Sequence, residues 1–211
     1  MSATQRPQRS DAARNRQRLL SAAAEVFAER GLEAGVGEIA DRAEVGRGTL
    51  FRNFPTKQDL IAAVVAAKMQ QAVADARELL RGDQAGSAVF TFLKEMVHGQ
   101  QRERALFQAI ADQFLTHPDI QAVHAELLQL LDELLQAGKQ AGTVRAEVGA
   151  VDVLLLTKGV CSAADALESS PEMLDRHLAL ITAAIATPGY EVSLGAPPAT
   201  AVLRPSAGRS G

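Results

Sequence analysis

The sequence predicts an all-α protein, with an N-terminal helix-turn-helix domain followed by a larger helical domain, about nine helices in all. Three observations lead to this fold class. Apolar residues recur at helical spacing along most of the 211 residues. The breaks between these periodic segments fall at Gly, Pro or capping residues. Alanine and leucine are abundant and only 4% of residues are aromatic, which suits packed helices.

The first expected helix covers residues 11–30 and ends at Gly31, because glycine commonly closes helices. Two short helices follow, at 36–43 and 47–53. A long helix without internal Gly or Pro then runs from residue 57 to residue 81 and links the two domains. The remaining periodic segments predict five more helices, at 85–101, 104–115, 118–140, 151–167 and 171–186.

These segments divide the chain into four regions. Residues 1–10 are polar and predict a disordered basic arm, and residues 11–56 form the helix-turn-helix domain. Residues 57–187 form the larger helical domain. Residues 188–211 hold eight Pro or Gly and no periodicity, so they predict a disordered tail.

The segment 36–60, VGEIADRAEVGRGTLFRNFPTKQDL, carries the clearest local signal. Its first short helix has an apolar face that includes Ile39. In the second, Leu50 and Phe54 are four residues apart and can pack back onto that face. Gly46 lies in the expected turn, where glycine tolerates the backbone angles of a tight connection. The segment therefore predicts two short helices packed against each other.

This packing leaves a polar face of the second helix outward, made by Arg47, Thr49, Arg52 and Asn53. Such a face suits the major groove of DNA, which is about 12 Å wide and admits one α-helix. Gly48 would let the helix backbone approach closely. A structural helical hairpin that never contacts DNA has the same spacing, so spacing alone does not separate the two interpretations.

Longer stretches resemble the DNA-binding domain of TetR-family transcriptional regulators. They are the helix RQRLLSAAAEVFAERGLEAG, the segment EIADRAEV and the run GRGTLFRNFPTKQDL. The resemblance as a whole covers roughly residues 14–64, about a quarter of the chain. The chain departs from the family at Phe51, where Tyr is usual, so a phenol hydroxyl that could reach a phosphate is missing. Gly46 stands where Ser is frequent.

The resemblance implies a homodimeric repressor that binds a near-palindromic double-stranded DNA operator and is released by an unidentified small-molecule effector. The two recognition helices would lie about 34–36 Å apart. The residues expected to contact DNA are Arg14, Arg47, Gly48, Thr49, Phe51, Arg52, Asn53 and Lys57. The residues expected around a ligand pocket in the second domain are Met69, Phe90, Leu93, Met96, Phe107 and Phe114.

The last two expected helices predict a dimer interface. The helix at 151–167 is apolar nearly all round, and such a helix is buried on all sides. The helix at 171–186 has one continuous apolar stripe. Pairing of both helices with their two-fold copies would make a four-helix interface. A monomer whose last helices only close the core is the alternative. The interface residues expected are Leu155, Leu174, Leu178, Ile181 and Ile185.

The charge distribution agrees with a DNA-binding N-terminal domain. The net charge is −3, yet residues 1–60 hold ten Arg or Lys against eight Asp or Glu. Positive charge is therefore concentrated where contact with phosphates is expected.

Several other classes of function find no support in the sequence. The chain has one cysteine, no metal-ligand spacing among its four histidines, and no nucleophile or phosphate-binding motif. We therefore expect no catalytic residue, no metal, no cofactor and no enzymatic activity. No apolar run approaches the ~18 residues of a membrane span, and no secretory signal is recognisable. These features favour a reducing cytoplasm.

Two alternative functions remain open. One is a regulator of the same fold that activates transcription, or that responds to a partner protein instead of a ligand. The other is a helical small-molecule-binding protein without any role at DNA. The second alternative predicts no salt-dependent affinity for DNA.

Overall fold

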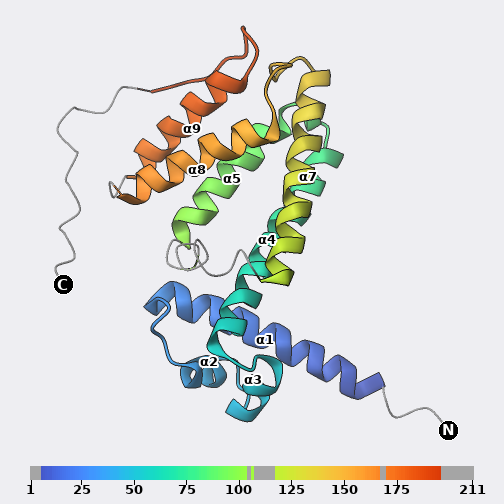
Figure 1. The fold of residues 1–211 in the computed structure, drawn as a ribbon, viewed down its shortest axis with the longest axis vertical. Coiled ribbons are helices and arrows are strands. Elements are labelled where there is room, and N and C mark those ends of the chain that lie inside the picture. Colours follow the sequence, from blue (N-terminus) through green and yellow to red (C-terminus); the bar gives the residue numbers. More distant parts are fainter. Residues whose placement is uncertain (1–5, 104–105, 107–116, 167–169, 196–211) are drawn as a thin grey trace. The chain divides into compact units, whose positions relative to one another are not determined.

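The computed structural model describes residues 6–103, 106, 117–166 and 170–195. These residues form eight α-helices and one short 3-10 helix and contain no strand, which confirms the all-α fold class (Figure 1). The helix expected at 104–115 lies almost wholly outside the described residues, as do residues 1–5 and 196–211. No helix in the described ranges is both long and apolar enough to cross a bilayer.

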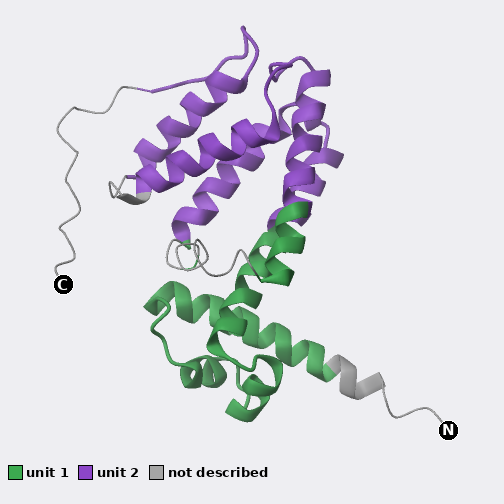
Figure 2. Cartoon of the chain, in the orientation of Figure 1, with its two compact units in different colours: residues 1–71, 103–125 green, residues 72–102, 126–211 purple. Residues whose placement is uncertain are grey.

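The chain divides into two compact units (Figure 2). Unit 1 comprises residues 1–71 and 103–125, and unit 2 comprises residues 72–102 and 126–211. Unit 1 contains α1 (Arg6–Arg30), α2 (Val36–Arg42), α3 (Arg47–Asn53) and the first part of α4 (Lys57–Arg81). The boundary falls after Gln71 inside α4, further along than the expected division after residue 56.

A common apolar core explains this later boundary. Leu19 and Val26 of α1, Leu50 of α3 and Leu60 and Val65 of α4 are all fully buried in one cluster. The first turns of α4 therefore complete the core of unit 1. Without α4, the apolar stripes of the three preceding helices would remain partly exposed to water.

Helix α1 begins earlier than expected. Residues 6–10 are helical, whereas the sequence-based interpretation placed them in a disordered arm. Pro7 lies in the first helical turn, where proline is tolerated because the amide hydrogens there have no helical partner. At the other end of α1, Gly31 has a φ of 71° and donates its N–H to the carbonyl of Phe27 at 2.9 Å, as expected for a closing glycine.

Unit 2 contains the end of α4, a 3-10 turn η1 (Ala85–Ser87), α5 (Ala88–Arg102), most of α7 (Pro118–Gln140), α8 (Ala150–Ala166) and α9 (Pro171–Ile185). Helices α5, α8 and α9 pack against one another (Figure 1). One apolar cluster joins them, with Val97 of α5, Cys161 and Ala164 of α8 and Leu174 and Leu178 of α9.

The apolar stripe of α9 faces this internal core. All four α9 residues expected in a dimer interface are buried within the subunit, so little of their surface is left for a second subunit to cover. Helical periodicity identifies a buried face but does not identify what buries it. The four residues are Leu174, Leu178, Ile181 and Ile185.

The segment after α9 is also more ordered than expected as far as residue 195. The ring of Tyr190 lies 4.7 Å from that of Phe90. Arg176 of α9 donates hydrogen bonds to the carbonyls of Leu194 and Gly195, at 2.7 and 3.0 Å. These contacts hold residues 190–195 on unit 2, so the predicted disordered tail does not begin at residue 188.

Candidate nucleic-acid interface

Helices α2 and α3 are joined by a tight turn whose strained residue is Glu44. Its φ of 53° is left-handed, and the N–H of Val45 donates to the carbonyl of Ala40 at 3.0 Å. Gly46, the residue expected to supply this conformation, is instead extended, with φ −69° and ψ 147°. Non-glycine residues adopt left-handed angles at a cost of about 1–2 kcal/mol. The turn therefore depends on the surrounding core.

The core orients α3. Leu50 and Phe54 are buried in the core of unit 1, as their spacing predicted, so the opposite face of α3 points to solvent. Of the residues expected to contact DNA, four are exposed on or beside this face and three are partly exposed. The exposed ones are Arg47, Gly48, Phe51 and Arg52, and the partly exposed ones are Thr49, Asn53 and Lys57.

Local hydrogen bonds organise the polar side chains of α3. The Nε of Arg52 donates to the carbonyl of Gly48 at 3.1 Å, and the amide of Asn53 donates to the carbonyl of Thr49 at 2.8 Å. The terminal nitrogens of Arg52 remain available for an acceptor outside the helix. A Cβ placed on Gly37 would lie only 2.5 Å from Nη2 of Arg47, so this guanidinium rests directly on the backbone of α2.

Phe51 is 46% exposed on the same face. A large apolar ring in water is unfavourable unless a partner covers it. On DNA, an apolar side chain can contact the C5-methyl group of thymine. Phe51 therefore suits base contact, although it lacks a hydroxyl for phosphate.

Arg16 contacts the C-terminal end of α3, a feature that the sequence did not reveal. Its guanidinium lies 4.4 Å from the centroid of the Phe54 ring, and Nη1 donates to the carbonyl of Asn53 at 3.4 Å. Arg14, two residues earlier on α1, is exposed and has no partner among the described residues. The N-terminal arginines thus differ in role although they look alike in sequence.

Thr56 and Asp59 cap the N-terminus of α4. The Thr56 hydroxyl accepts from the N–H of Asp59 at 3.0 Å, and the Asp59 carboxylate accepts from the N–H of Thr56 at 2.9 Å. Lys57 follows as the first helical residue. A cation and the positive end of a helix dipole together favour a phosphate at this position.

Arg42 fixes α2 to α1. Its guanidinium donates to both carboxylate oxygens of Glu29, at 3.0 and 2.8 Å, and to Glu25 at 3.4 Å. The hydrogen bond from Arg42 lowers the pKa of the Glu29 carboxyl below its ordinary value. Arg42 is therefore a structural cation, while Arg47 and Arg52 are not engaged by carboxylates in the described part of the chain.

The ligand pocket expected in the second domain stays a prediction. Phe107 and Phe114 lie outside the described residues. Met69 packs on the core of unit 1, while Leu93 is buried and Phe90 and Met96 are partly buried in unit 2.

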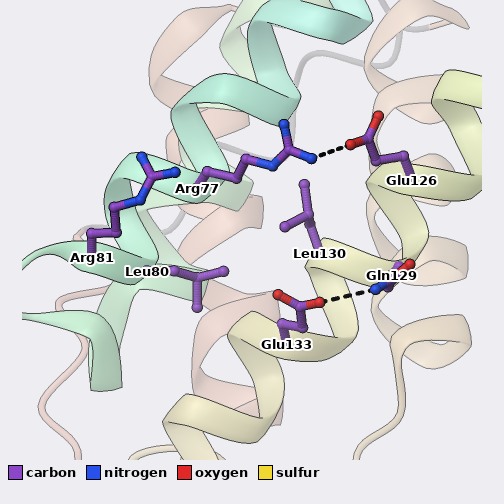
Figure 3. A pocket seen from close by; sticks show the side chains of 7 residues that line it. All are labelled: Arg77, Leu80, Arg81, Glu126, Gln129, Leu130 and Glu133. Carbon is purple, nitrogen blue, oxygen red and sulfur yellow. Dashed lines mark hydrogen bonds and ion pairs between the residues drawn. The ribbon is translucent and has the colours of Figure 1, made fainter.

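Unit 2 has a groove of about 300 Å³ between α4 and α7 (Figure 3). Arg77 of α4 forms an ion pair with Glu126 of α7 across it, and Leu80 and Leu130 contribute apolar surface. None of the expected pocket residues lines this groove. Its remaining lining residues are Arg81, Gln129 and Glu133.

Helix α8 exposes an apolar surface. Val151 and Leu155 are 65% and 63% exposed, and Leu156 is also exposed, as is Leu180 of α9. Small exposed residues continue the same helix toward its C-terminus, namely Gly159, Ser162 and Ala163. Of the five residues expected in a dimer interface, only Leu155 belongs to this surface.

Among the residues that the structure describes, no cluster of His, Cys, Asp or Glu could hold a metal ion.

Two sequence families match the chain. Residues 19–64 match the family described as "Bacterial regulatory proteins, tetR family". Residues 84–186 match the family described as "Transcriptional regulator SbtR-like, C-terminal domain". The first match covers the second half of α1, all of α2 and α3 and the start of α4, and the second covers η1, α5, α7, α8 and α9.

Individual proteins give the same result. The HTH-type transcriptional activator FasR of Mycolicibacterium smegmatis is 34% identical over 113 residues, which are 51% of this chain and 50% of FasR. The chain thus matches about half the length of FasR. A TetR transcription regulatory protein from Mycobacterium vanbaalenii is 34% identical, with a TM-score of 0.68 over 86% of this chain and 100% of that one.

A more distant structural neighbour contains a ligand. It is the transcriptional regulator FadR from Bacillus subtilis in complex with stearoyl-CoA, which is 18% identical. The superposition has a TM-score of 0.59 and covers 80% of this chain and 98% of FadR. At this identity the similarity concerns the fold alone.

Proposed function

Because the chain belongs to the TetR family of transcriptional regulators, we propose that it binds a near-palindromic operator as a homodimer and represses transcription until a small molecule releases it. The outward face of α3 carries this proposal. Arg47 and Arg52 present guanidinium groups that can donate in pairs to guanine O6 and N7. Phe51 and Thr49 offer apolar contacts for thymine methyl groups.

Contacts outside α3 would hold the protein on the DNA backbone. Lys57 at the start of α4 and Arg14 on α1 are suited to phosphates, which fix register without carrying sequence information. Bases would then be read by α3 and phosphates by the flanking helices. This division of roles predicts different effects of mutation at Arg47 and at Lys57.

The exposed apolar surface of α8 and α9 supports dimerisation. Val151, Leu155, Leu156 and Leu180 would be removed from water if the same surface of a second copy covered them. The small residues Gly159 and Ser162 would let two α8 helices approach closely. We therefore assign the interface to the outward face of this helix pair, with Leu155 retained from the expected set and the buried α9 stripe left out.

The ligand is proposed to be apolar or amphipathic and to bind in the second domain. Support comes from the FadR complex with stearoyl-CoA, a protein of the same fold. Ligand binding would favour an arrangement of the two recognition helices that no longer matches the operator. We also propose a cytoplasmic location and no enzymatic activity, as for a regulator that acts on DNA by binding.

Selection from random DNA tests the proposal directly. The full chain is incubated with a random double-stranded library, bound sequences are enriched, and affinity for the enriched sequence is measured at several salt concentrations. We expect a near-palindromic sequence whose two half-sites lie one helical turn apart. Failure to enrich any sequence would contradict the proposal and favour a helical small-molecule-binding protein.

Activation is the second candidate mode, and one observation favours it. FasR, which is 34% identical over half of this chain, is named a transcriptional activator. Operator position separates the two modes, since a repressor site overlaps the promoter and an activator site lies upstream. A reporter assay with and without the protein measures the sign of regulation.

A further inference from the structure

We propose that Arg16 is a positioning residue that sets the orientation of α3 and thereby the discrimination between operator and other DNA. This inference rests on the proposed DNA-binding function. It differs from a phosphate contact, the usual role of an arginine near a DNA-binding helix. Arg16 would act through the recognition helix, without touching the bases.

Two contacts join this arginine to the end of α3. Its guanidinium lies over the Phe54 ring, 4.4 Å from the centroid. One of its nitrogens, Nη1, donates to the carbonyl of Asn53, the last residue of α3, at 3.4 Å. Phe54 itself is only 1% exposed and donates its N–H to the carbonyl of Leu50 at 2.8 Å. Arg16 therefore links α1 to the C-terminal turn of α3.

Each contact stabilises one property of that turn. The last carbonyls of a helix lack helical partners, and a cation there is favoured by the helix dipole. The negative face of an aromatic ring attracts a cation and fixes the ring between guanidinium and core. Since α3 has only seven residues, fixing one end largely fixes the direction of the whole helix.

Neighbouring arginines of α1 provide the comparison. Arg18 forms an ion pair with Glu44 at 2.6 Å, and Arg14 is exposed with no partner among the described residues. Arg14 and Arg16 have the same charge and lie on the same helix, two residues apart. Arg16 contacts the last turn of α3, whereas Arg30, at the other end of α1, pairs with a carboxylate of α2 at 3.0 Å. Equal substitutions at Arg16 and Arg30 therefore separate charge from position.

The guanidinium plane is essential to this role. Lysine keeps the charge but cannot stack flat on the ring while donating sideways to a carbonyl. Arg16→Lys should therefore resemble Arg16→Met, whereas Arg30→Lys should resemble the wild type. A phosphate contact would give the opposite result at residue 16, because lysine serves phosphate as a point charge.

The binding experiment compares the full chain with Arg16→Lys, Arg16→Met and the control Arg30→Lys on the selected operator and on unrelated DNA. Both Arg16 variants should lose about tenfold in operator affinity and less than about twofold on unrelated DNA, with an unchanged salt slope. If Arg16→Lys binds like the wild type, or if the slope falls by about one, Arg16 is a phosphate contact and the inference is wrong.

Hydrogen exchange tests the same inference without DNA. The Phe54 amide should exchange about tenfold faster in Arg16→Lys, because the turn that protects it is less constrained. The Val26 amide, in the core of α1, should be unchanged, which excludes general destabilisation. Equal acceleration at both amides, or none at Phe54, would overturn the inference even if the protein bound no DNA. If the protein bound no DNA but the Phe54 amide alone exchanged faster in Arg16→Lys, only the proposed function would be contradicted.

Discussion

Leu155 of α8 allows the dimer assignment to be tested quantitatively. Complete burial of a leucine side chain is worth about 1.5–3 kcal/mol, and Leu155 is 63% exposed in the isolated subunit. Covering it in an interface should therefore contribute about 1–2 kcal/mol per subunit, or about 2–4 kcal/mol in a two-fold dimer. At 1.4 kcal/mol per tenfold, Leu155→Ala should raise the dimer Kd by about 30- to 700-fold.

Leu155→Glu should have a larger effect, because two carboxylates would be desolvated near each other. Sedimentation velocity over a dilution series measures the dimer Kd, and operator binding is measured alongside. Phe51→Glu is the matched control, since it also replaces an exposed apolar side chain with a carboxylate. It should leave the dimer intact and abolish operator binding.

An unchanged dimer Kd for both Leu155 variants would refute the assignment and place the interface elsewhere. Leu178→Ala is a further control within α9. Leu178 is buried in the subunit core, so this variant should clearly lower the melting temperature while leaving the dimer Kd nearly unchanged. A selective loss of dimerisation in Leu178→Ala would restore the interface predicted from the sequence.

Three further predictions concern unit 1. In anisotropy titrations, Arg47→Ala should weaken operator binding by about 1–3 kcal/mol and relax the preference at one base position per half-site. Lys57→Ala should weaken binding to all DNA and reduce the salt slope by about one. Equal effects of both variants on every DNA would contradict this division of roles. Gly31→Ala forces a side chain into a left-handed position and should cost about 1 kcal/mol, or about 2–4 °C in Tm by calorimetry; an unchanged Tm would show that the helix end adjusts. Because Arg42 lowers the pKa of Glu29 in the folded state, their ion pair stabilises the folded protein at neutral pH, and this stabilisation is lost as pH falls below about 4.5 through the folded pKa. The Tm difference between wild type and Glu29→Gln should therefore shrink on acidification, and a difference independent of pH would contradict this.

The sequence predicted the helix-turn-helix unit closely because its signals are local. Gly31 marks the C-terminal end of α1, Gly46 marks the start of α3, and Thr56 with Asp59 marks the start of α4. Leu50 and Phe54 identify the buried side of α3, so the polar face follows by exclusion. Such signals depend on a few neighbouring residues and need no knowledge of the rest of the fold.

The sequence was less informative wherever a partner had to be identified. The α9 stripe of Leu174 and Leu178 has a clear period, but the period does not tell whether the covering surface belongs to the same chain. Arg16 offers only a positive charge in the sequence, and its ring partner lies 38 positions further on. Glu44 has no side-chain feature that predicts a left-handed residue. These properties arise from tertiary packing.

The most direct test of two α3 helices acting together is the spacing of the operator half-sites. Inserting about five base pairs between them turns one half-site to the opposite side of the DNA, since one helical turn takes about 10–10.5 base pairs. We predict that this insertion reduces affinity at least about a hundredfold, to the level of a single half-site. Equal affinity for the original and the expanded operator would contradict recognition by a dimer with one α3 in each major groove.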